Sequence, residues 1–109
     1  MTALQTLLAF YYLCDQAAAQ QVLNRGDVDA CMANYNELKL TFIDEMPAPI
    51  GGHERAAQNR LGYVGFKAWE QANPDLVAEY RARALLVLAY SQRPGRTAIA
   101  GLTSPLGAD

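Results

Sequence analysis

Few side chains in this sequence could do chemistry, and the single histidine, His53, is the first of them. It follows Gly51-Gly52 and precedes Glu54, at the expected start of a helix. One imidazole does not supply the three or four ligands of a usual zinc site, and the glycine–lysine pattern of a phosphate-binding loop is absent from the sequence. We therefore interpret His53 as a surface residue and expect neither a metal nor a cofactor. A small enzyme that combines His53 with carboxylates from separate helices is the alternative.

The second candidate group is the pair of cysteines, Cys14 and Cys31. If two antiparallel helices meet at Gly26, the two sulfurs lie roughly 10 Å apart along the helix axis. That spacing is too long for a disulfide and predicts two free, buried thiols. Free thiols are typical of a reducing compartment, and no basic residue precedes the apolar run at residues 7–14, as a secretory signal requires. We therefore expect a cytoplasmic protein.

Asp15 is the most unusual charge, because it falls on the apolar stripe of the first expected helix. A carboxylate in such a place needs a partner or a raised pKa. Arg83 lies beside the apolar stripe of the last expected helix and could supply that partner, as could a Tyr hydroxyl. We predict a buried ion pair between Asp15 and Arg83 that fixes the helix register. A catalytic role for Asp15 as an acid is the alternative.

Three aromatic residues, Tyr63, Phe66 and Trp69, could stack on nucleic-acid bases. Proteins that bind single strands combine such residues with a basic groove. Here only Arg60 and Lys67 lie nearby, and the chain carries a net charge of −2. We expect no nucleic-acid partner.

These residues must be positioned by helices. Apolar residues recur with helical periodicity in four stretches, at about 3–24, 28–45, 53–72 and 74–92. Gly26 is expected to close the first helix and Asp27 to cap the second. Asn73 is a good N-cap for the last helix, Pro74 suits its first position, and Asp75 complements the helix dipole.

The third expected helix carries apolar residues on two sides. Phe66 points away from the main stripe of this helix. Gly62 and Gly65 each weaken a helix by roughly 1 kcal/mol relative to Ala, so we expect another backbone to approach closely there. The main stripe consists of Ala57, Leu61, Val64 and Ala68.

The pattern predicts an all-α protein, a compact bundle of about four helices. Its 109 residues fit one helical domain at 1–93 and an irregular tail at 94–109 that contains Pro and Gly. No apolar run is long enough to span a bilayer, so we expect no membrane partner.

Residues 12–45 resemble a single tetratricopeptide hairpin. The resemblance depends on small and bulky residues at matching places in two helices, namely Ala19, Val22, Cys31 and Tyr35. The sequence departs from the family at Asp15, where a large aromatic residue is expected. One repeat does not form a solenoid. The resemblance implies peptide or protein binding.

The helices carry more apolar surface than a bundle of this size can bury, and such patches typically mark interfaces. We therefore predict a non-enzymatic protein–protein interaction protein, such as an adaptor, regulator or assembly factor. Its partner is another protein or a second copy of the chain, as a homo-oligomer. A structural subunit of a larger assembly, such as a virion or a secretion particle, is the alternative. The expected partner-binding residues are Phe66, Trp69, Leu85, Leu86 and Tyr90.

Overall fold

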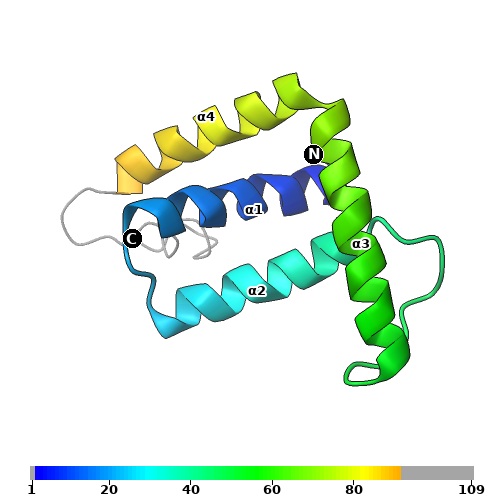
Figure 1. Ribbon diagram of the computed structural model, residues 1–109. Helices are drawn as coiled ribbons and strands as arrows, with labels where there is room; N and C mark the ends of the chain where they lie inside the picture. Colours follow the sequence, from blue (N-terminus) through cyan, green and yellow to red (C-terminus); the bar gives the residue numbers. More distant parts are fainter. Residues whose placement is uncertain (1, 92–109) are drawn as a thin grey trace.

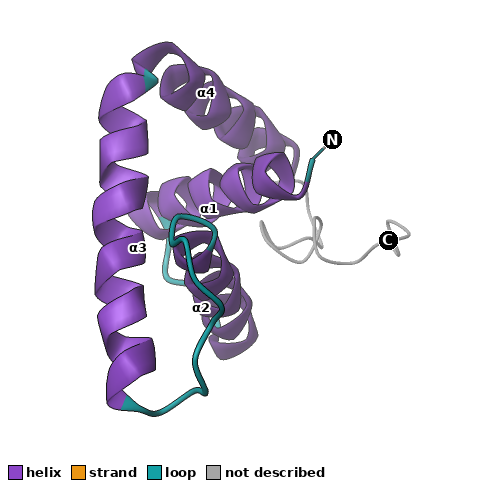
Figure 2. Ribbon diagram, turned by 90° about the vertical axis from the view of Figure 1, so that its right-hand side faces the viewer, coloured by secondary structure: helices purple, strands orange, loops and turns teal. Residues whose placement is uncertain are grey.

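The structure, a computed structural model, describes residues 2–91, and over this range it confirms the all-α bundle. The helices are α1 (Ala3–Gln20), α2 (Arg25–Leu40), α3 (His53–Ala72) and α4 (Pro74–Ser91). α1 lies between α2 and α4, and α3 runs across one end of this layer (Figures 1 and 2). The predicted tail at 94–109 lies outside the described residues.

α1 is the central helix of the bundle. It packs against α2 on one side and against α4 on the other, which explains why its middle is apolar nearly all round. Thr2 and Gln5 close its N-terminus with a capping box, in which the Thr2 hydroxyl accepts from the Gln5 N–H at 3.1 Å. The side chains that α1 buries completely are Leu8, Tyr12, Leu13 and Ala17.

The predicted boundary at Gly26-Asp27 is wrong. α1 ends at Gln20 instead, and α2 begins after Asn24, whose Oδ1 accepts a hydrogen bond from the Asp27 N–H at 2.8 Å. Asn is among the strongest N-cap residues, and its side chain satisfies one of the free N–H groups of the first turn. Gly26 therefore lies inside the first turn of α2, with an ordinary negative φ.

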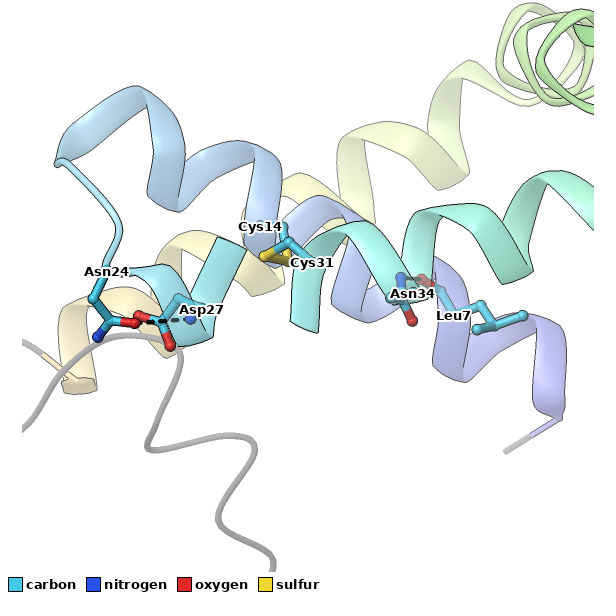
Figure 3. Close-up of a disulfide and its surroundings, with 6 residues drawn as sticks. All are labelled: Leu7, Cys14, Asn24, Asp27, Cys31 and Asn34. Carbon is cyan, nitrogen blue, oxygen red and sulfur yellow. Dashed lines mark hydrogen bonds between the residues drawn. A yellow bond between two sulfur atoms is a disulfide. The ribbon is translucent and has the colours of Figure 1, made fainter. Parts of the chain in front are cut away.

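The prediction of two free thiols is also wrong, because Cys14 and Cys31 form a disulfide with a Cα–Cα distance of 5.9 Å (Figure 3). Cys14 lies six residues before the end of α1 at Gln20, and Cys31 lies six residues after the start of α2 at Arg25. Two antiparallel helices therefore bring the cysteines to the same level. The argument for a reducing compartment loses its basis.

α2 ends at Leu40, five residues earlier than predicted. Beyond it the chain tightens into a turn in which the Phe42 N–H donates to the Lys39 carbonyl at 3.1 Å and the Ile43 N–H to the Leu40 carbonyl at 3.4 Å. α3 passes directly over this turn. The chain therefore leaves the axis of α2 after Leu40 and continues as a loop to the start of α3.

The expected close approach of a backbone to Gly62 and Gly65 is confirmed. A Cβ added to Gly62 would overlap the backbone carbonyl of Lys39, and one added to Gly65 would lie 2.9 Å from the Cβ of Phe42. The two glycines therefore let α3 lie against the C-terminal end of α2. This contact decides which side of α3 faces the core.

Gln58 attaches the loop between α2 and α3 to the bundle. Its buried side chain accepts from the Ala48 N–H at 2.8 Å and donates to the Glu45 carboxylate and the Met46 carbonyl, both at 2.9 Å. Arg55 adds a hydrogen bond of 2.7 Å to the Ala48 carbonyl. The loop is thus held by side chains of α3, because it has no helical hydrogen bonds of its own.

The predicted break between α3 and α4 is confirmed at Asn73-Pro74. The Asn73 carbonyl accepts the first helical hydrogen bond of α4, from the Val77 N–H at 3.0 Å. The Asn73 side chain turns back and donates to the Trp69 carbonyl at 2.8 Å, so it closes α3. Within residues 2–91, no helix combines the length and the apolar character of a bilayer span.

Candidate binding surfaces

Phe66, which we expected on the partner-binding surface, is completely buried. Its ring lies 4.9 Å from Tyr11, 6.5 Å from Tyr35 and 5.9 Å from Phe42, measured between ring centroids. Trp69 stacks on Phe66 at 6.3 Å and is only partly exposed. Phe66 therefore belongs to the core and cannot contact a partner, because the side of α3 that carries Gly62 faces inward.

The opposite side of α3 carries the apolar stripe that the periodicity singled out, and this stripe faces solvent. Leu61 is 59% exposed and Val64 is 64% exposed. Ala68 is exposed and Ala57 is half-buried. We call Ala57, Leu61, Val64 and Ala68 the outer stripe. Since the inner side of α3 already holds the helix in place, the outer stripe is not needed to attach α3 to the bundle.

α4 carries a second group of exposed apolar residues. Its inner side buries Ala84 and Leu88. Leu86 is 72% exposed, and Leu85 and Tyr90 are about half exposed. The structure thus places three of the five predicted partner-binding residues on the surface of α4.

The predicted buried ion pair between Asp15 and Arg83 is not formed. Asp15 is exposed and accepts a long hydrogen bond of 3.4 Å from the neighbouring Gln16 side chain. Arg83 is also exposed and pairs with Glu79, one turn earlier on α4. Because both charges reach water, neither requires a partner across the bundle.

The sequence analysis missed a charged network that links α1 with α3. The Tyr12 hydroxyl donates to Glu70 Oε2 at 2.6 Å, and the Lys67 ammonium lies 2.6 Å from Glu70 Oε1. Burial by itself raises the pKa of Glu70, but the hydrogen bonds from Lys67 and Tyr12 outweigh it and hold this pKa below its usual value. The sequence gives only a weak indication of this network. Glu70 lies one turn after Phe66, on the side of α3 that the structure shows to be buried.

The same network raises the pKa of Tyr12 well above its usual value. Burial is the largest cause, and the hydrogen bond to Glu70 is the next. Burial, followed by the charge of Asp15, raises the pKa of Tyr11 to about 12. Both phenols stay neutral near pH 7, and the network serves to join two helices at the aromatic core.

An apolar cavity of about 300 Å³ opens between α1 and α2 beside the disulfide. Its lining includes Tyr11 and Tyr35, with ring centroids 5.3 Å apart, and Leu23 from the loop between the two helices. Asp15 is the charged residue of its lining. The remaining lining residues are Cys14, Ala18, Val28, Cys31 and Met32.

His53 is exposed at the first position of α3. A second cavity opens beside this helix end, and its lining includes Asn36, Arg55 and Asn59 but neither His53 nor an acidic side chain. Across residues 2–91 no group of three or more potential metal ligands comes together. This cavity therefore does not assemble the groups that the enzyme alternative requires.

Comparison of the chain with protein-family models, with curated proteins and with solved structures gave no match.

Proposed function

We propose that this chain is a non-enzymatic protein–protein interaction protein that binds its partner through the outer stripe of α3. One observation carries the proposal: the most regular apolar stripe of the helix faces solvent, with Leu61 and Val64 exposed by more than half. Complete burial of a fully exposed Leu or Val contributes roughly 1.5–3 kcal/mol, and about 60% of that remains to be gained at these two side chains. An adaptor, a regulator and an assembly factor all need a surface of this kind.

The spacing of the outer stripe favours a helix as the partner element. Its members alternate at intervals of four, three and four residues, and this spacing is the seam along which two helices interlock side chains. Arg60 and Lys67 follow one edge of the stripe. Lys67 already pairs with Glu70 on its own helix. If two copies paired their stripes antiparallel, the two basic edges would therefore meet and gain no charge attraction. The charges therefore favour a different protein that presents an amphipathic helix with an acidic edge.

The experiment compares a stripe variant with a matched surface variant. Leu61→Glu/Val64→Glu places two charges in the outer stripe, and Ala19→Glu/Ala33→Glu places two charges at exposed positions of α1 and α2. Both variants should keep the helical circular dichroism of the wild type. We expect wild type and matched variant to capture the same protein from the native source, and the stripe variant to lose it.

Two results would contradict this proposal. One is capture of the same protein by all three forms. The other is the failure of all three forms to capture any protein from the native source, together with light scattering that shows the purified chain to be a monomer at every concentration. A stable dimer that Leu61→Glu/Val64→Glu dissociates would keep the stripe as the interface but identify the partner as a second copy.

The disulfide also changes the expected compartment. Structural disulfides form and persist in oxidising environments and are rare in the cytosol. We propose that the chain folds where Cys14 and Cys31 are oxidised. Mass spectrometry of protein purified from its native source under non-reducing, alkylating conditions should find no alkylated cysteine. Two alkyl groups per chain would show that both thiols are free, as expected in a reducing compartment.

A further inference from the structure

The cavity beside the disulfide is a second feature of the surface, and none of its lining residues belongs to α3. It therefore stands apart from the outer stripe. At about 300 Å³, it lies at the lower end of the range for small-molecule sites. Apart from Leu23 in the connecting loop, its walls come from α1 and α2, which the disulfide joins with 5.9 Å between the two Cα atoms. The cavity is thus preformed.

The chemistry of the walls selects a ligand class. Two tyrosine rings, from Tyr11 and Tyr35, and the side chains of Val28 and Met32 offer an apolar surface with aromatic faces. Asp15 is the only charged residue in this lining, and no ion pair engages it within residues 2–91. The charge of Asp15 acts on Tyr11, whose pKa it helps to raise, whereas the Tyr35 ring already has the Lys39 ammonium 4.5 Å from its centroid. A carboxylate near the Tyr11 ring attracts an organic cation through both its charge and the ring quadrupole.

We propose that this cavity binds a small molecule with an aromatic or apolar body and a protonated amine. The body lies between the tyrosine rings and Met32, and the ammonium group faces Asp15. Because the pKa of Tyr11 is raised to about 12, its phenol is neutral over the pH range in which the amine is protonated. The cavity carries no basic lining residue that could pair with an anionic ligand.

Three probes of nearly equal size test the proposal: phenethylamine, phenethyl alcohol and hydrocinnamate, which carry a positive, a neutral and a negative group. Each is titrated into the oxidised full-length protein while amide chemical shifts are recorded by NMR. We expect the amine to shift the amides of Ala18, Val28 and Met32 with a dissociation constant of about 1 mM. The alcohol should bind roughly threefold more weakly, and hydrocinnamate more weakly still.

Asp15→Asn and the matched variant Glu37→Gln each remove one negative charge, and both residues are exposed. Glu37 lies on α2 outside the cavity. We expect Asp15→Asn to weaken amine binding roughly threefold, to the level of the alcohol, and Glu37→Gln to leave it unchanged. The proposal is overturned if the three probes bind alike, if the two variants behave alike, or if the amine shifts no cavity amide at concentrations up to about 10 mM. These results do not depend on the outer stripe.

Discussion

The two halves of α2 are held to the rest of the molecule in different ways. In the C-terminal half, Leu38 is completely buried, and the Lys39 backbone lies directly against Gly62 of α3. In the N-terminal half, which the structure describes completely, no apolar side chain is buried: Val28 is 43% exposed and Met32 is 50% exposed. One end of the helix is packed into a core, and the other lies on a surface.

The N-terminal half is attached by specific links instead. Cys31 is bonded to Cys14, and just past the midpoint of α2 the Asn34 side chain donates to the Leu7 carbonyl of α1 at 3.0 Å (Figure 3). A covalent bond allows two helices to stay together without filling the space between them. This difference explains why a cavity persists beside the disulfide. The C-terminal half of α2, in contrast, packs so closely against α3 that an added atom would clash.

The largest effect is expected from removing the disulfide with Cys14→Ser/Cys31→Ser. The bond spans a sequence separation of 17 residues, and a loop of this size contributes about 3 kcal/mol by restricting the unfolded chain. Urea unfolding should show this loss against the oxidised wild type. Ala19→Ser, at an exposed position of α1, serves as the control and should change stability by less than about 0.5 kcal/mol. A loss below about 1 kcal/mol in the double variant would show that packing, not the bond, holds this end.

Gly62→Ala tests the packed end and should cost about 2–3 kcal/mol, because its new Cβ meets the Lys39 carbonyl and forces the helices apart. Gly26→Ala is the matched variant at the other end. The nearest heavy atom to its Cβ would be the Asn24 Oδ1 at 3.5 Å, so helix propensity should stabilise it by up to about 1 kcal/mol. Equal unfolding midpoints for the two variants in urea would refute the difference between the two ends.

Tyr12→Phe tests the hydrogen bond that joins α1 to α3. It keeps the buried ring but removes the hydrogen bond to Glu70, and we expect a loss of about 1.5 kcal/mol, because the acceptor is charged. Tyr63→Phe, at an exposed tyrosine, should have no measurable effect. A double-mutant cycle with Glu70→Gln isolates the pair, and a coupling energy near zero would show that the hydroxyl does not join α1 to α3.

The smallest expected effect is a loss of folding stability at acid pH. The pKa of Glu70 lies below its usual value in the folded protein, so its contribution to stability is complete above the unfolded value of about 4.3 and is lost as the pH falls through the lower folded value. Unfolding free energies measured through this range should fall more steeply for wild type than for Glu70→Gln. Identical pH profiles for the two proteins would contradict the network.

The helices themselves could be predicted from the sequence. Periodic apolar residues mark all four, and the Asn73-Pro74 break follows from the geometry of proline. Gly62 and Gly65 correctly indicated a close backbone approach. These features depend on residues near one another in the chain, which is why local rules suffice for them.

The orientation of α3 could not be predicted in the same way. Leu61 lies on one apolar side of the helix and Phe66 on the other, and periodicity alone does not say which side is buried. The decision comes from the turn after α2, because only the side with Gly62 allows the Lys39 backbone to approach. The outer stripe therefore faces solvent, although its periodicity is that of a helix side packed against a core.

The cysteine pairing failed because of a shift of a few residues. Placing the turn at Gly26 separated Cys14 from Cys31, whereas the cap at Asn24 sets both at the same level. The prediction for Asp15 was wrong for a different reason: this residue is exposed and lines a surface cavity, because the apolar stripe of α1 is not buried along its whole length. In a helical hairpin, small errors in a boundary change which side chains meet.

Amide hydrogen exchange of the oxidised and the reduced protein tests the difference between the two ends most directly. If the disulfide alone secures the N-terminal half of α2, reduction should strip protection from the amides around Val28 and Cys31 while those around Leu38 and Phe66 exchange as slowly as before. Loss of protection spread evenly over both regions, or none in either, would contradict the account.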